Sequence, residues 1–85
     1  MKVKGKVCVV TGAAGGIGEA VARRFAREGA KGVVVADMDA ARLEKVAREI
    51  GGLAVAGDIG KESEVKKLIA EAEKKYGPVD IFFSN

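Results

Sequence analysis

The sequence is poor in the residues that most often carry catalysis, disulfide bonds or base stacking. It contains no histidine and a single cysteine, Cys8, and its aromatic residues are one tyrosine and three phenylalanines. One cysteine cannot form an internal disulfide, which favours a reducing compartment, so we expect a cytoplasmic protein. Cys8 lies within an apolar run and is interpreted as a small core residue. So few aromatic rings provide no stacking platform for nucleic-acid bases.

Long apolar runs are also missing. No stretch approaches the ~18 consecutive apolar residues that a membrane span requires. The first six residues, MKVKGK, lead directly into a strand pattern and do not resemble a secretory signal. Apolar residues make up 48% of the chain and charged residues 32%, which is typical of soluble globular proteins. We expect no membrane partner and, at 85 residues, one domain at most, residues 1–85.

The net charge of +3 raises the question of a nucleic-acid partner. The basic residues, however, alternate with acidic ones at helical spacing. Glu44 and Arg48, for example, form an (i, i+4) pair in the favourable order. These charges indicate solvated helix faces, so we expect no nucleic-acid partner.

Buried-strand and amphipathic-helix patterns alternate along the chain with short breaks. Continuous apolar, mostly β-branched runs predict strands at residues 6–11, 32–36, 53–56 and 79–83. Apolar side chains at helical spacing predict helices at residues 17–28, 40–50 and 62–76. Asp39 is the expected N-cap of the second helix, and Gly29 is expected to end the first. The first helix is expected to bury a stripe made of Ile17, Ala20, Val21 and Phe25.

This alternation predicts an α/β fold. Connections of helical length imply parallel strands joined by right-handed crossovers. The expected architecture is a doubly wound, Rossmann-type sheet of four strands in the order 3-2-1-4 with three helices. The fourth strand, residues 79–83, would then form an exposed edge through which the isolated chain could self-associate. We therefore expect a chain that is truncated relative to a finished sheet.

The segment TGAAGGIGEA, residues 11–20, places four glycines directly after the first strand. At the start of a helix, free N–H groups and about half a positive charge point outward and attract anions. Gly12 suits the turn, Gly16 allows a ligand to approach the backbone, and Gly18 allows the helix to pack close to the strand. A tight turn without a ligand would need only one glycine. The segment therefore predicts a binding site for phosphate groups.

The residues around these glycines exclude two common types of phosphate-binding loop. A Walker A loop requires Gly-Lys-Ser/Thr, whereas Gly18 is followed here by Glu19 and Ala20. The common dinucleotide spacing G-x-G-x-x-G is also absent, and the spacing is Gly12-x-x-x-Gly16-x-Gly18. Taken alone, such a loop is a weak signal.

Asp37 strengthens the prediction of a dinucleotide site. This residue ends the second strand, where a carboxylate can accept hydrogen bonds from the hydroxyls of an adenosine ribose. Asp39 can cap the next helix, which would leave Asp37 free. The Asp37 charge would repel a 2′-phosphate, and no lysine or arginine lies at residues 13–17 to offset it. We therefore predict NAD rather than NADP.

A second acidic residue follows the third strand. Asp58 could accept a hydrogen bond from an adenine amino group while the backbone of Ile59 meets the ring. Asp58 fits almost as well as a simple turn residue before Gly60, and both interpretations stay open.

Together these residues resemble the N-terminal, cofactor-binding half of the short-chain dehydrogenase/reductase family. The resemblance is carried by residues 11–18, by Asp37, by Asp58 and Ile59, and by the closing segment DIFFSN, residues 80–85. It implies that the diphosphate and the adenosine ribose are contacted by Gly12, Ala14, Gly15 and Ile17, in the loop that Gly16 and Gly18 complete. It also implies a role for Asn85 near the nicotinamide-side ribose and in bracing the central strands.

The resemblance further implies an oxidoreductase that transfers hydride between NAD(H) and an alcohol or carbonyl, often as a homo-oligomer. The family's catalytic Tyr-x-x-x-Lys has no match here. Tyr76 is followed four residues later by Asp80 and belongs to an apolar helix stripe, and Ser84 has no histidine to activate it. We predict no catalytic residue and no metal ligand. The alternatives are a free-standing nucleotide-binding module and an interaction protein that pairs through its open strand.

Overall fold

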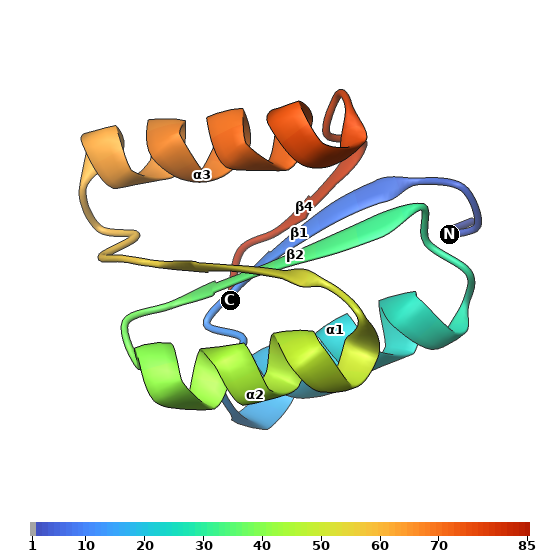
Figure 1. Cartoon of the computed structure of the whole chain (residues 1–85), viewed down its shortest axis with the longest axis horizontal. Coiled ribbons are helices and arrows are strands. Elements are labelled where there is room, and N and C mark those ends of the chain that lie inside the picture. Colours follow the sequence, from blue (N-terminus) through green and yellow to red (C-terminus); the bar gives the residue numbers. More distant parts are fainter. Residues whose placement is uncertain (1) are drawn as a thin grey trace.

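A computed structural model describes residues 2–85, in which strands and helices alternate along the chain (Figure 1). The strands of this segment are β1 (Val7–Thr11), β2 (Gly32–Asp37), β3 (Leu53–Ala56) and β4 (Ile81–Phe83). Its helices are α1 (Gly16–Arg27), α2 (Ala40–Ile50) and α3 (Glu62–Tyr76). All strand pairs are parallel, and the strand order is β3-β2-β1-β4. The predicted Rossmann-type fold class and strand order are confirmed.

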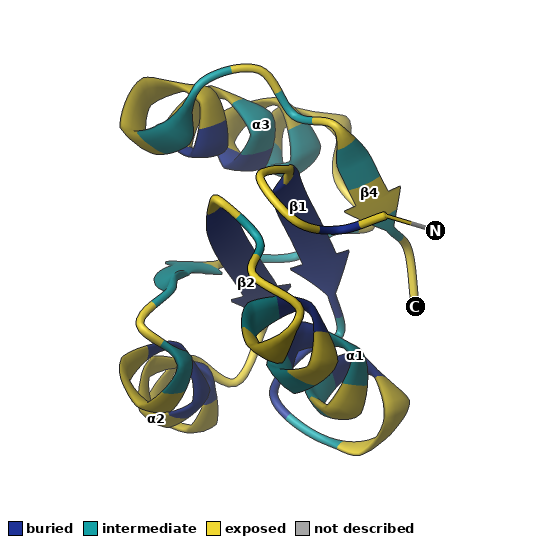
Figure 2. Cartoon of the chain, turned by 90° about the vertical axis from the view of Figure 1, so that its right-hand side faces the viewer, coloured by how far each residue is buried: buried dark blue, intermediate teal, exposed yellow. Residues whose placement is uncertain are grey.

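The two central strands carry the core. All five residues of β1 are buried, and β2 is buried up to Ala36 (Figure 2). Because side chains alternate along a strand, Cys8 and Val10 face α1 and α2, whereas Val9 faces α3. Helices cover both faces of the sheet, which explains why these strands read as continuous apolar runs. Cys8 is fully buried, as expected of a core residue.

Strand β4 lies at the edge of the sheet and is shorter than predicted. It begins at Ile81 because Asp80 is joined to β1 outside the regular ladder. The Asp80 amide donates to the Val7 carbonyl at 2.9 Å, and the Asp80 carboxylate accepts from the Val7 amide at 2.8 Å. Phe82 is 40% exposed on this edge strand, but self-association through it stays a prediction. Among residues 2–85, no helix has the length and apolar character needed to cross a membrane.

The buried face of α1 matches the predicted stripe only in part. Phe25 is buried and Val21 packs against the core, as predicted, but Ile17 is 69% exposed and Ala20 is also exposed. The residues that α1 buries are Gly18, Ala22 and Phe25. The helix is rotated in this way because Gly18 packs directly against the end of β1. A helix face that contains Gly18 continues through Ala22 and Phe25 and turns Ile17 outward.

Helix α3 packs closely on β2 through Tyr76. The Tyr76 ring lies against Gly32, the first residue of β2, so closely that a Cβ atom at Gly32 would overlap the ring. Tyr76 is partly buried and belongs to the apolar layer on this face of the sheet, as its helix stripe predicted. Gly32 is thus required for the close approach of α3 to the sheet.

We expect Gly32→Ala to lower the free energy of unfolding by about 1–3 kcal/mol, because the new methyl group would overlap the Tyr76 ring. Chemical denaturation of the full gene product measures this loss. Gly57→Ala is the matched control. A Cβ at Gly57 would meet only the flexible carboxylate end of Glu64, so we expect a change of about 0.5 kcal/mol or less. Equal losses in the two variants would contradict the proposed packing.

Candidate ligand-binding site

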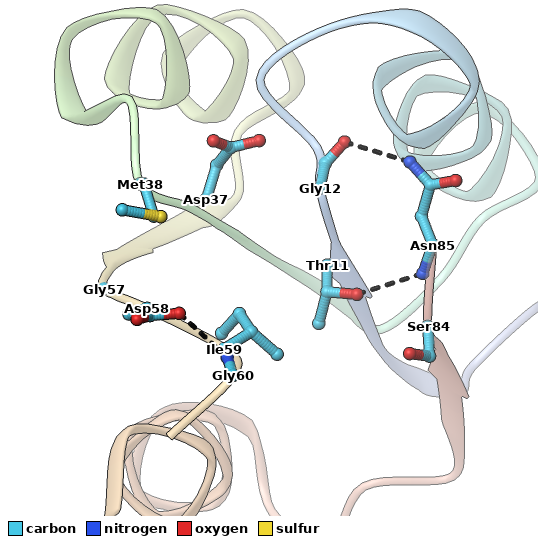
Figure 3. Close-up of a pocket in the computed structure, with 10 residues that line it drawn as sticks. All are labelled: Thr11, Gly12, Asp37, Met38, Gly57, Asp58, Ile59, Gly60, Ser84 and Asn85. Atoms are coloured by element: carbon cyan, nitrogen blue, oxygen red, sulfur yellow. Dashed lines mark hydrogen bonds between the residues drawn. The ribbon is translucent and has the colours of Figure 1, made fainter. Parts of the chain in front are cut away.

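A pocket of about 380 Å³ opens at the carboxyl ends of all four strands (Figure 3). In an open parallel sheet this edge is where ligands bind. The lining residues follow β1, β2, β3 and β4 in turn, and they are Thr11, Gly12, Asp37, Met38, Gly57, Asp58, Ile59, Gly60, Ser84 and Asn85. The pocket therefore contains five of the residues predicted from the sequence, namely Gly12, Asp37, Asp58, Ile59 and Asn85.

The glycine-rich loop leads from β1 into α1 beside this pocket. Gly12 and Gly16 have φ angles of +62° and +57°, which residues with side chains rarely adopt. Gly15 is the N-cap of α1 and has no side chain to cap the helix. By contrast, the N-cap of α2 is Asp39, which accepts a hydrogen bond from the Arg42 amide at 3.2 Å, as predicted. The first amides of α1 thus have no side-chain cap, as is also the case for α3, and a helix start of this kind can bind an anion.

Gly18 brings the start of α1 against the end of β1. A Cβ atom at Gly18 would overlap the Gly12 carbonyl oxygen and would lie 3.0 Å from Nδ2 of Asn85. The close helix–strand packing predicted for Gly18 is therefore confirmed.

Asn85 ties the ends of β1 and β4 together. Its backbone amide donates to Oγ1 of Thr11 at 3.0 Å, and its Nδ2 donates to the Gly12 carbonyl at 3.3 Å (Figure 3). The Thr11 hydroxyl donates in turn to the Phe83 carbonyl at 3.5 Å. The bracing role that the resemblance implied for Asn85 is thus present, while its contact with a ribose stays a prediction. The sequence placed Thr11 in the glycine-rich segment but could not reveal these bonds, because its partners lie more than seventy residues away.

Asp37 is not free, contrary to expectation. One carboxylate oxygen accepts from the Ala14 amide at 3.1 Å and the other accepts from the Asp39 amide at 3.1 Å. Partial burial raises the pKa of Asp37, but the amides of Asp39, Ala14 and Met38 and the charge of Arg42 outweigh it, so the pKa is lowered overall. Each carboxylate oxygen has a second lone pair, so Asp37 can still accept hydrogen bonds from a ligand.

Arg42 provides a cation that inspection of residues 13–17 could not reveal. It lies in the first turn of α2, and its Nη2 is 3.7 Å from a carboxylate oxygen of Glu19. The same Nη2 lies 3.4 Å from the position that a Cβ atom on Gly15 would occupy. The glycine-rich loop is therefore flanked by one acid, Asp37, and one base, Arg42.

Asp58 stabilises the turn before α3, which is one of the two interpretations that the sequence left open. Its Oδ1 accepts from the Gly60 amide at 2.9 Å, and its carbonyl accepts from the Lys61 amide at 3.0 Å. Ile59 is partly buried against the apolar layer beneath α3 and also lines the pocket. Their contacts with an adenine ring stay predictions.

The other predicted residues surround the pocket without lining it. Ala14 is linked to the pocket through the hydrogen bond of its amide to Asp37. The start of α1 is formed by Gly15, Gly16 and Ile17, and Gly18 lies behind them. Within the described part of the chain, no cluster of three or more histidine, cysteine, aspartate or glutamate residues could hold a metal ion.

Comparisons with known proteins agree with this geometry. A family model described as short chain dehydrogenase matches residues 6–85. The chain belongs to this family. One relative, the mitochondrial (-)-isopiperitenol/(-)-carveol dehydrogenase of Mentha piperita, is 45% identical over 87 residues. That match covers 99% of this chain but only 33% of the relative, so the chain spans about a third of the curated relative's length.

Two solved structures with this fold are complexes with a nicotinamide dinucleotide. A 3-ketoacyl-(acyl-carrier-protein) reductase from Brucella melitensis, complexed with NADH, is 51% identical with a TM-score of 0.89. The match covers 94% of this chain and 34% of the reductase. A short chain dehydrogenase/reductase from Burkholderia phymatum, in complex with NAD, is 29% identical with a TM-score of 0.91, over 96% of this chain and 31% of that protein.

We expect Gly18→Ala to destabilise the protein by about 1–3 kcal/mol, because the added methyl group would overlap the Gly12 carbonyl. The sign is informative, since alanine normally stabilises a helix interior by about 0.5–1 kcal/mol relative to glycine. Ala20→Gly, at an exposed position of the same helix, is the control and should show this ordinary preference. Denaturation curves of both variants measure the effect, and a more stable Gly18→Ala protein would contradict the packing.

The lowered pKa of Asp37 predicts how the stability of the fold depends on pH. A carboxylate whose pKa is lower in the folded state stabilises the fold above its unfolded-state pKa and loses this effect as the pH falls. The difference in unfolding free energy between the wild type and Asp37→Asn should therefore be largest above about pH 5 and shrink below it. Denaturation at several pH values tests this, and a difference that grows at acidic pH would refute it.

Proposed function

We propose that residues 1–85 form the NAD-binding part of an oxidoreductase that transfers hydride between NAD(H) and an alcohol or carbonyl substrate. The observation that carries the proposal is the uncapped start of α1, which opens beside an acid-lined pocket at the carboxyl edge of the sheet. Membership of the short chain dehydrogenase family supports it. Neighbouring structures that contain NADH and NAD support the choice of cofactor.

In this proposal the backbone of the glycine-rich loop holds the diphosphate. Gly12 and residues 15–18 present amides to it, whereas the Ala14 amide is bound to Asp37. Residues 12–16 carry no bulky side chain, and the helix dipole of α1 favours the negative charge of the diphosphate. The adenosine ribose lies at Asp37, the adenine at Asp58 and Ile59, and the nicotinamide-side ribose at Asn85. Bound NAD supplies the hydride chemistry, while these residues bind and orient the cofactor.

Asp37 favours NAD over NADP. A 2′-phosphate about 4 Å from the carboxylate would be repelled by roughly 1–4 kcal/mol, or one to three decades of affinity. Asp37, whose pKa is lowered, is charged throughout the neutral range, as an ordinary aspartate is, so the repulsion persists there.

In the family, proton transfer to or from the substrate uses a Tyr-x-x-x-Lys motif. These 85 residues do not contain that motif. Nucleotide binding is therefore the part of the reaction that this segment performs. The substrate, a homo-oligomeric assembly and a cytoplasmic location stay predictions, and one relative is named as a mitochondrial protein.

Calorimetry on the full gene product tests the proposal. We expect NAD to bind at least about tenfold more tightly than NADP, because of the Asp37 charge. Asp37→Ala should weaken NAD binding and remove the preference. Glu73→Ala is the matched control, because this exposed acidic residue lies on α3, away from the pocket. A folded protein that binds neither dinucleotide would refute the proposal.

A further inference from the structure

The open edge of β3 carries a groove of about 350 Å³ on the face of the sheet that α3 covers. This edge is opposite to β4 in the strand order, and within residues 2–85 no strand pairs with its outer side (Figure 1). The groove shares no lining residue with the pocket at the carboxyl ends of the strands, so it is a separate surface feature. It is lined by the strand itself and by two charged residues of α3, namely Leu53, Ala54, Val55, Ala56, Lys67 and Glu71.

Two residues of β3 direct their main-chain hydrogen-bonding groups toward this open side. The Gly57 amide, just after the strand, donates to the Asp37 carbonyl of β2 at 3.1 Å. Because successive residues of a strand turn their N–H and C=O groups to opposite sides, Val55 also faces β2, whereas Ala54 and Ala56 face outward. The strand contains no proline and no charged residue, which are the usual protections of an exposed edge. Its main chain is therefore open to pairing with another strand.

Lys67 and Glu71 flank this edge with one positive and one negative charge. Both side chains are exposed, and within residues 2–85 neither takes part in an ion pair. Lys66 and Glu62, on the same helix, do pair at 3.3 Å. A lysine four residues before a glutamate is the less favourable order on a helix, which agrees with this difference. The groove therefore presents two opposite charges that the single chain leaves without a partner.

We propose that β3 is a self-association edge, at which β3 of a second copy of this chain pairs antiparallel about a two-fold axis through Val55. In this arrangement Ala54 of each copy lies opposite Ala56 of the other, and the outward N–H and C=O groups of both residues are paired. The Val55 side chains, which lie on the α3 face of the sheet, meet across the axis as a close, non-hydrogen-bonded pair. The inference does not depend on the proposed nucleotide binding.

Charge complementarity favours a second copy over an unrelated partner. Lys67 and Glu71 line the same groove as the whole of β3, so a two-fold axis through the middle of the strand reverses their order in the second copy. Lys67 of each copy then faces Glu71 of the other, and both charges are paired. An acidic peptide in the groove would oppose Glu71, and a basic one would oppose Lys67. Only a partner with the reversed order of charges satisfies both residues, and a second copy has this order.

Charge reversal tests the pairing on the full gene product, with the molecular mass measured by analytical ultracentrifugation over a range of concentrations. Lys67→Glu and Glu71→Lys each place like charges opposite one another, so we expect each variant to weaken association through β3 at least about tenfold. An equimolar mixture of the two variants should associate again, because every glutamate then faces a lysine. Glu73→Lys is the matched control, since it makes the same charge change at an exposed position of α3 outside the groove, and it should associate as the wild type does.

A second variant tests the main-chain part of the pairing. Ala56→Pro removes an N–H group that faces outward and breaks no bond to β2, so we expect a folded protein with about half the mass of the wild type. Ala56→Ser keeps the N–H group and is the control, which should retain the wild-type mass. Circular dichroism checks that both variants are folded.

The mass measurements decide the inference. Weaker association of Lys67→Glu and of Glu71→Lys, with recovery in their mixture, supports it. A wild type whose mass equals that of both charge variants at every concentration overturns it, and so does a mixture that fails to recover. A folded Ala56→Pro protein with the wild-type mass also overturns it. Should Ala56→Pro not fold, the charge variants still decide, because they change only exposed positions of α3.

Discussion

The site depends on the contact between Gly18 and Gly12. The first turn of α1 lies directly on the carbonyl at the end of β1, at a distance that no Cβ atom could occupy. This contact fixes where the helix begins, and therefore where its free amides and its partial positive charge are directed. Asn85 holds the same carbonyl from the side of β4, so the end of the first strand is fixed by both neighbours.

The glycines near this contact serve different purposes. Gly12 and Gly16 allow backbone angles that other residues rarely adopt, whereas Gly18 allows close packing. Gly15 leaves the helix without a side-chain cap. The uncapped helix, the acid at Asp37 and the base at Arg42 then lie around one loop, and the partial positive charge of the helix start is the feature that favours an anion there.

Local patterns were sufficient to predict most of the fold. Continuous β-branched runs identified the buried strands, Asp39 and Gly29 marked helix ends, and parallel order followed from the helical connections. Sequence spacing also placed Gly12, Asp37 and Asp58 at one edge of the sheet, because the carboxyl ends of parallel strands meet there.

The features that could not be predicted all depend on distant contacts. The phase of α1 follows from the packing of Gly18 against β1, and an apolar stripe that began at Ile17 could not reveal it. The bonds of Asp37 to the Ala14 amide and of Asp80 to Val7 join residues 23 and 73 positions apart. Arg42 reaches the loop from another helix, so a search for basic residues within the loop did not find it.

The central claim is that bare main chain at the start of α1 holds the diphosphate of a nicotinamide dinucleotide. A crystal structure of the full gene product with NAD tests it most directly. We expect diphosphate oxygens within hydrogen-bond distance of amides in residues 12–18, with an adenosine ribose hydroxyl on Asp37. A cofactor bound elsewhere, with this loop empty or filled by one of the protein's own side chains, would contradict the account.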